Sequence, residues 1–98
     1  MTAARCPEKG TELRHPFDRR QVAVAFGKVL KALRREAGLS QEAFAHLAGL
    51  DRTTPSLYER GVRQPTLTYL LILAQALGLK AELLVAETRR RMEDKSLR

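Results

Sequence analysis

Apolar side chains recur at helical spacing between residues 21 and 37 of the chain. They stand at Phe26, Val29, Leu30, Leu33 and Ala37. Intervals of three, four and seven positions place such side chains on one face of a helix. We therefore predict a helix from about Gln21 to Ala37, ended by Gly38.

A second, shorter helix is expected from Gln41 to Ala48. Ser40 precedes it as a good N-cap, because its hydroxyl can accept a backbone N–H that has no partner within the helix. Leu39 and Phe44 are spaced for a hydrophobic staple across that cap, and Gly49 ends the helix as a left-handed residue. The candidates for its inner side are Phe44, Ala45, Leu47 and Ala48.

A third helix is predicted from Arg52 to Arg60, and Pro55 leaves its start open. With Asp51 as the N-cap, Pro55 is the fourth helical residue and removes the first intrahelical hydrogen bond. With Thr54 as the N-cap, Pro55 takes the favoured first position and the helix is shorter. Two short helices joined by a glycine turn form the arrangement that lays a helix in a DNA major groove.

Two further helices complete the pattern. One runs from Leu67 to Leu77 between a Thr66 cap and a Gly78 stop, and the other from about Ala81 to Arg90. Their inward-facing side chains are Leu70, Leu73, Ala74, Leu77 and Leu84. No stretch shows the alternation of a strand, so we expect an all-α fold of five helices.

The same pattern divides the chain into three parts. Residues 1–20 lack periodicity and are expected to form a flexible N-terminal arm. Residues 21–88 form the helical domain, and residues 89–98 form a basic C-terminal tail expected to be frayed. Arg14, Arg19 and Arg20 of the arm could touch a DNA backbone or minor groove, although a disordered, solvated leader is the interpretation that we favour.

A net charge of +7 suggests a polyanionic partner. Its distribution weakens the argument, because residues 26–86 carry eight Lys/Arg against five Asp/Glu, a balance of +3. Residues 1–20 and 87–98 each carry five against three, a balance of +2 for each terminus. Charge alone therefore favours nucleic acid only moderately over simple solubility.

Other classes of protein find little support in the sequence. Cys6 is the only cysteine, which excludes an intrachain disulfide and fits the cytoplasm. No apolar run reaches the roughly 18 residues of a membrane span, and Cys6 and His15 lack neighbouring residues that would complete a metal site. No glycine-rich phosphate loop or catalytic Cys/His/Asp set is present, so we expect neither an enzyme nor a cofactor.

Residues 26–85 resemble the Cro/repressor-type, or XRE, helix-turn-helix family. The matching pieces are Leu33-Arg34, Gly38-Leu39-Ser40-Gln41, Ala45, Gly49-Leu50, Tyr58-Glu59-Arg60-Gly61, Pro65 and Ala74-Gln75-Ala76-Leu77-Gly78. The resemblance implies a lambda-repressor-like domain of five helices. It also implies that a homodimer binds double-stranded operator DNA with the third helix in the major groove.

Carried over position by position, the resemblance implies two sets of DNA contacts. The candidates for base edges are Arg52, Thr53, Ser56 and Leu57. The candidates for phosphates are Ser40, Gln41, Arg60, Arg63 and Gln64. Arginine suits guanine O6 and N7, while the methyl groups of Thr and Leu suit the thymine methyl.

In this family an Arg late in the first helix pairs with a Glu late in the third. Arg34 and Glu59 stand at the matching positions. We interpret them as a structural ion pair, rather than reading Arg34 as a phosphate contact.

The sequence departs from the family pattern at two positions. Pro55 stands where a core aliphatic residue is usual, and Ile72 stands where a polar residue is common. Ile72 gives its helix a second apolar stripe, which suggests a partner surface. We predict that Tyr69, Ile72 and Leu83 contribute to a dimer interface.

The sequence thus favours a sequence-specific transcriptional regulator. An antitoxin that binds a toxin partner and represses its own operon is an alternative, and a restriction–modification controller is a third reading within the regulator class.

Overall fold

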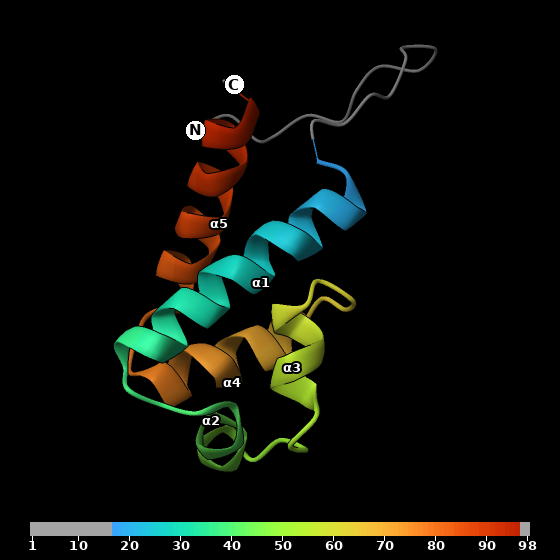
Figure 1. Ribbon diagram of the computed structural model, residues 1–98. Coiled ribbons are helices and arrows are strands. Elements are labelled where there is room, and N and C mark those ends of the chain that lie inside the picture. The colour runs from blue at the N-terminus through green and yellow to red at the C-terminus, as the bar shows by residue number, and fades with distance from the viewer. Residues whose placement is uncertain (1–16, 97–98) are drawn as a thin grey trace.

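The structure is a computed structural model that describes residues 17–96. Its five helices are α1 (Arg19–Glu36), α2 (Gln41–Ala48), α3 (Thr54–Glu59), α4 (Leu67–Leu77) and α5 (Ala81–Ser96). Long α1 runs diagonally across the view, with α5 packed on one side of it and α2, α3 and α4 grouped on the other (Figure 1). The predicted all-α fold is confirmed, because residues 17–96 contain no strand.

Every helix contributes to one hydrophobic core. Its buried members are Phe26, Leu30, Phe44, Tyr58, Leu73, Ala74 and Leu84. Burying a side chain as large as Leu or Phe stabilises the folded state by about 1.5–3 kcal/mol. The core therefore fixes the position of α3 through Tyr58, which is 2 % exposed.

The helix ends follow the local sequence signals. Ser40 Oγ accepts a hydrogen bond from Ala43 N at 3.0 Å, and Thr66 Oγ1 accepts one from Tyr69 N at 3.1 Å. Gly49 ends α2 with a φ of 69°, a left-handed conformation that L side chains rarely adopt. The predicted bounds of α2 and α4 are confirmed.

Both ends of the described chain are more helical than predicted. α1 begins at Arg19, because Asp18 caps it by accepting a hydrogen bond from Gln21 N at 3.1 Å. α5 continues beyond Arg90 to Ser96. Part of the predicted arm and most of the predicted tail are therefore helical, whereas Cys6, Arg14 and His15 lie outside the described residues.

Contacts at Thr88 and Arg89 fix α5 close to the point where the predicted helix ends. Thr88 is buried and donates a hydrogen bond to the Leu84 carbonyl at 2.8 Å. At the next position, the guanidinium of Arg89 lies 5.8 Å from the centre of the Phe17 ring and 3.9 Å from Glu93. The contact between Arg89 and Phe17 joins α5 to the segment before α1.

Leu47 does not lie on the inner side of α2. It is 59 % exposed, whereas Phe44 and Ala45 are buried. Each helical residue turns the chain by about 100°, so Leu47 lies about 60° from Phe44 and about 160° from Ala45, beyond the edge of the buried face. A helix of eight residues is too short for its apolar pattern to define the inner side.

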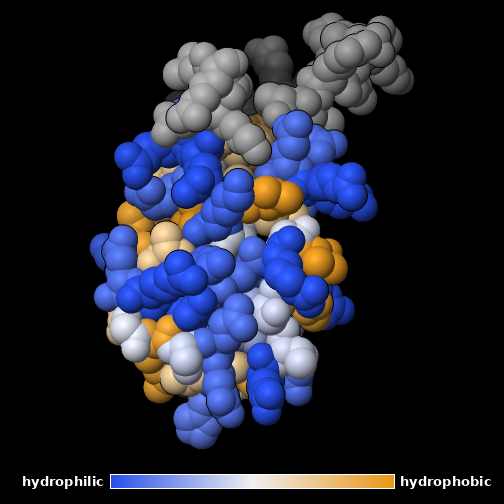
Figure 2. Space-filling model, viewed as in Figure 1, coloured by the Kyte–Doolittle hydropathy of each residue, from blue (hydrophilic) through white to orange (hydrophobic). Residues whose placement is uncertain are grey.

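Hydrophilic side chains cover most of the face seen in Figure 2, and hydrophobic side chains appear there in separate patches. Within residues 17–96, no single helix is both long and apolar enough to cross a membrane. α4 and the first part of α5 meet those criteria only as a pair, across a bend of 103°.

Candidate nucleic-acid interface

α3 is shorter than the predicted helix and begins at Thr54. Thr53 occupies the N-cap position, so Pro55 is the second helical residue and neither predicted alternative holds as stated. The first N–H groups of a helix have no partner within it, and the proline therefore removes no intrahelical hydrogen bond. The Pro55 ring is fully buried and takes the place of an aliphatic core residue.

A tight turn replaces the first part of the predicted helix. Asp51 Oδ2 accepts hydrogen bonds from Thr53 N at 3.1 Å and from the Thr53 hydroxyl. The Asp51 carbonyl accepts a further hydrogen bond from Thr54 N at 3.0 Å. The bonds from Thr53, helped by the nearby Arg52 cation, lower the pKa of Asp51. The turn thereby fixes the backbone of Arg52 and Thr53 ahead of α3.

The C-terminal end of α3 lies against the backbone of α1 at Gly27. A Cβ atom on Gly27 would lie 2.7 Å from the Glu59 carbonyl oxygen, and closer still to that of Tyr58. Only glycine allows this approach without a shift of one helix. Gly27 therefore sets how closely α3 can pack on α1.

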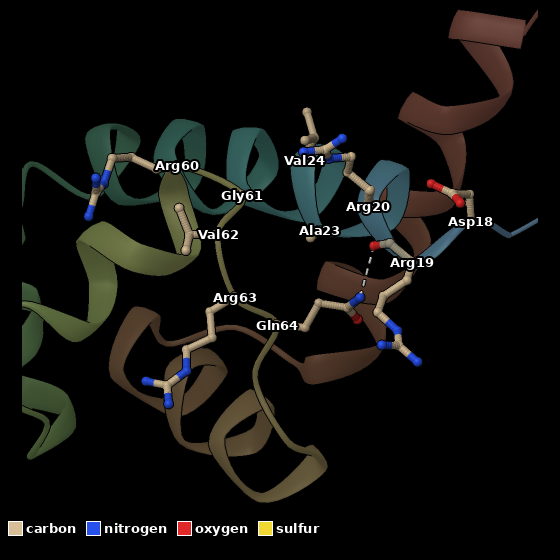
Figure 3. A pocket seen from close by; sticks show the side chains of 10 residues that line it. All are labelled: Asp18, Arg19, Arg20, Ala23, Val24, Arg60, Gly61, Val62, Arg63 and Gln64. Atoms are coloured by element: carbon tan, nitrogen blue, oxygen red, sulfur yellow. Dashed lines mark hydrogen bonds between the residues drawn. The ribbon is translucent and has the colours of Figure 1, made fainter.

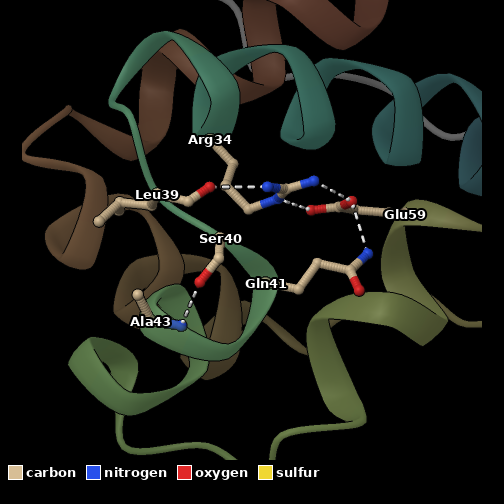
Figure 4. A network of polar contacts seen from close by, with 6 residues as sticks. All are labelled: Arg34, Leu39, Ser40, Gln41, Ala43 and Glu59. Carbon is tan, nitrogen blue, oxygen red and sulfur yellow. Dashed lines mark hydrogen bonds and ion pairs between the residues drawn. The ribbon is translucent and has the colours of Figure 1, made fainter.

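A polar network connects α1, α2 and α3 on the side of α3 that faces the rest of the protein (Figure 4). Arg34 Nε lies 2.6 Å from Glu59 Oε2, and Arg34 Nη2 lies 3.1 Å from Oε1. Gln41 Nε2 donates to Glu59 Oε1 at 2.9 Å, and Arg34 Nη1 donates to the Leu39 carbonyl at 2.7 Å. The side chains of Arg34 and Glu59 are only 9 % and 2 % exposed. Such a paired and hydrogen-bonded arrangement compensates the burial of both charges.

The opposite side of the turn and of α3 faces outward. Arg52 and Thr53 are exposed, and Ser56 and Leu57 are partly exposed. Thr53 is the member of this set whose hydroxyl is already engaged, with Asp51. Two of the four predicted base-contact residues thus lie in the turn, and the other two lie in α3 directly after it.

The predicted phosphate-contact residues lie in two places. Ser40 and Gln41 are at the beginning of α2, where one caps the helix and the other binds Glu59. Arg60, Arg63 and Gln64 follow α3, and the Gln64 side chain donates to the Arg19 carbonyl at 3.0 Å. That hydrogen bond attaches the loop between α3 and α4 to the beginning of α1.

The loop and the beginning of α1 enclose a broad hollow of about 1330 Å³ (Figure 3). Four arginines line it: Arg19, Arg20, Arg60 and Arg63. The loop also approaches Tyr58, whose pKa is raised by burial against the opposing influence of the Arg63 cation. The hollow therefore has a strongly basic border that joins α1 to the end of α3.

The predicted dimer residues lie on α4 and α5. Tyr69 is 41 % and Leu83 is 37 % exposed, while Ile72 is half-buried. Leu71 of α4 and Val85 of α5 are also large exposed hydrophobic residues. These helices therefore present more apolar surface than the core requires.

The sequence pattern did not single out Gly27, and it placed Arg19 and Arg20 in a flexible arm. An isolated glycine inside a helical pattern was an available signal, because its cost to the helix calls for a packing reason. The two arginines preceded the apolar stripe, so periodicity could not assign them to a helix. Asp18, a residue type that favours the N-cap, was the signal that could have done so.

Two short helices joined by a tight turn, the second braced from behind and exposed in front, define a helix-turn-helix domain. A family model described as helix-turn-helix matches residues 30–84, and the chain belongs to this XRE-type family of DNA-binding transcriptional regulators. The family predicted from the sequence is confirmed.

Several relatives fit this assignment. The chain is 44 % identical over 62 residues to the uncharacterized HTH-type transcriptional regulator y4dJ of Sinorhizobium fredii, covering 63 % of this chain and 80 % of the relative. It is 42 % identical over 59 residues to the control protein C.MunI of a Mycoplasma species, covering 59 % and 80 %. The solved restriction-modification controller protein C.AhdI of Aeromonas hydrophila is 45 % identical, with a TM-score of 0.62 over 63 % of this chain and 94 % of that one.

Proposed function

We propose that the protein is a homodimeric transcriptional regulator that binds a short palindromic operator in double-stranded DNA, with α3 in the major groove. The observation that carries the proposal is the contrast across α3, whose rear is held by a buried ion pair while its front is exposed. A rigidly held helix with free side chains is what reading base edges requires. The proposed place of action is the cytoplasm.

In this proposal the turn and α3 read the bases. The exposed Arg52 offers its guanidinium to guanine O6 and N7, which is the commonest specific contact. Thr53 and Leu57 present methyl groups to the thymine methyl, and the Ser56 hydroxyl can pair with either base type. Since the Thr53 hydroxyl is bound to Asp51, its methyl group is the part that remains for DNA.

The phosphate contacts come from both sides of the turn. Arg60 and Arg63 are exposed cations that can bind phosphate directly. The amides of Gln41 and Gln64 each use one N–H internally and retain a second one for a phosphate oxygen. The Ser40 hydroxyl accepts from Ala43 N and can still donate its own proton.

Selection of bound duplexes from a random oligonucleotide pool tests this function. We expect a palindromic consensus, because a symmetric dimer requires symmetric half-sites. Arg52→Ala should lose about 1–3 kcal/mol of discrimination at one position of each half-site. Arg63→Ala should weaken all duplexes alike. A pool that yields no preferred sequence at low salt would contradict the proposal.

We further propose that Tyr69, Ile72 and Leu83 contribute to the dimer interface, supported by the exposure of Tyr69 and Leu83 and the partial exposure of Ile72 on neighbouring helices. Ile72→Glu places a charge in that apolar surface and should produce a monomer in sedimentation experiments. Gln75→Glu is the matched control, because it adds the same charge at an exposed position of the same helix. An unchanged dimer in the Ile72 variant excludes this interface.

The relatives favour a particular kind of regulator. C.MunI is named a control protein and C.AhdI a restriction-modification controller, at 42 % and 45 % identity. We therefore infer that control of restriction–modification genes is the second, more specific candidate function. A transcription assay on DNA upstream of such genes should respond to the protein, whereas an antitoxin would instead co-purify with a toxin encoded beside it.

A further inference from the structure

The hollow beside the loop between α3 and α4 concentrates positive charge. Arg19 and Arg20 come from the beginning of α1, while Arg60 and Arg63 come from the end of α3 and the following loop (Figure 3). All four residues are exposed. In the chain itself, Arg60 and Arg63 are 41 positions or more from Arg19, so the fold and not the sequence brings the two pairs together.

The neighbouring carboxylates do not neutralise this charge. Within the described residues, none of the four arginines forms an ion pair with an Asp or Glu. Asp18 is the acidic residue that lines the hollow, and its side chain is engaged as the cap of α1. The border of the hollow therefore carries four cations and one anion.

Local helix stability does not account for Arg19 and Arg20. Cations in the first turn of a helix interact unfavourably with its dipole, and the first turn of α1 contains no acidic residue. The fold nevertheless holds this segment against the loop through the hydrogen bond from Gln64 to the Arg19 carbonyl. The arrangement keeps the two arginines beside Arg60 and Arg63 at a cost to α1.

We propose that Arg19 and Arg20 bind phosphates of the duplex that flanks each operator half-site, beyond the base pairs read by α3. The inference rests on the proposed function, because Arg60 and Arg63 are there phosphate contacts of the same hollow. A basic border that continues from α3 to α1 fits the continuous row of phosphates along a DNA strand. It extends the DNA footprint without adding base recognition.

The test compares two double variants of the full-length protein. Arg19→Ala/Arg20→Ala removes the proposed contacts, and alanine preserves the helix. Lys28→Ala/Arg35→Ala removes the same charge from exposed positions of α1 that do not line the hollow. Binding is measured against salt on the selected operator with and without about ten base pairs of flanking duplex, one helical turn, on each side.

Each phosphate contact contributes about −0.9 to the salt slope. On the flanked operator, we expect the slope of the first variant to be shallower by about 2 per protomer. Between 50 and 200 mM salt, the wild type should consequently lose about tenfold more affinity per protomer than this variant. The selected base consensus should remain the same, and the difference should disappear on the operator without flanks.

Three results would overturn the inference. The Arg19/Arg20 variant could keep the salt slope of the wild type, or its slope could be equally shallow on the operator without flanks. The Lys28/Arg35 control could also show the same decrease in slope. Each would leave the proposed function standing as long as the wild type selects an operator. Failure of the wild type to prefer any duplex would instead remove the proposed function, and the inference with it.

Discussion

The rear and the front of α3 differ in almost every physical respect. The rear packs Tyr58 into the core, lies against the backbone at Gly27 and ends in the buried Arg34–Glu59 pair. The front, together with the turn that precedes α3, carries Arg52 and other exposed or partly exposed side chains. A helix of six residues is too short to be stable alone in water. Its position is therefore imposed by the rear, which leaves the side chains in front available for the proposed DNA contacts.

The ion pair offers the strongest way to break this contrast. Glu59→Ala leaves the Arg34 guanidinium buried without a counter-charge, which typically costs about 3–5 kcal/mol. Gln41 also loses its hydrogen-bond acceptor. We expect chemical denaturation to reveal a loss of this size, with DNA binding lost as a consequence of unfolding.

Glu59→Gln is the matched control, because its amide keeps the shape and one acceptor oxygen. It should lose less stability than the alanine variant. If Glu59→Ala unfolds at the wild-type denaturant concentration but fails to bind DNA, the pair acts in recognition and the bracing role is wrong.

Gly27 tests the steric part of the same contact. Ala is favoured over Gly by about 1 kcal/mol inside a helix, yet here its methyl group would meet the backbone of α3. Overpacking of this kind costs about 1–3 kcal/mol, so we expect Gly27→Ala to lower the free energy of unfolding. Ala32→Gly, at an exposed position of α1, measures the propensity effect alone. A stabilised Gly27→Ala variant would show that α3 can move away at no cost.

The two sides also differ in how far the sequence predicts them. The resemblance located the pair Arg34 and Glu59 and the exposed set around Arg52, because these depend on residue type at fixed positions. It did not reveal that α3 begins at Thr54, because the start of this helix depends on whether the Pro55 ring is buried in the core. It also could not place Arg19 against Gln64, because that contact depends on the packing of a loop against a distant helix end. Residue types at fixed positions therefore predicted the helices and the candidate site residues. Tertiary packing determined where α3 begins and which distant segments meet.

A pair of arginine substitutions sharpens the contrast directly. Arg52→Ala should change the free energy of unfolding by no more than about 0.5 kcal/mol, as is usual for exposed positions. Arg34→Ala leaves the Glu59 carboxylate buried and should cost about 3–5 kcal/mol. Urea denaturation of the two variants compares the same chemical change in front of and behind α3. Equal losses would mean that the front is also structural.

The smallest expected effect concerns Asp51, whose turn connects the two sides. Its hydrogen bonds from Thr53 make the folded-state pKa lower than the ordinary value of 3.8. A carboxyl group with a lowered pKa stabilises the folded state fully above its unfolded pKa, and this stabilisation disappears as the pH falls through the folded pKa. The stability difference between wild type and Asp51→Ala should thus be constant at neutral pH and shrink below about pH 3.8.

Asp51→Asn separates charge from hydrogen bonding in that turn. Its amide oxygen still accepts from Thr53, and it has no proton to gain in this range, so its stability relative to Asp51→Ala should not change with pH. Urea denaturation at a series of pH values follows all three proteins. A wild-type advantage that grows as the pH falls would contradict the assigned direction of the pKa shift. The Asp51 charge would then oppose folding, instead of supporting the turn that holds Arg52 and Thr53 ahead of α3.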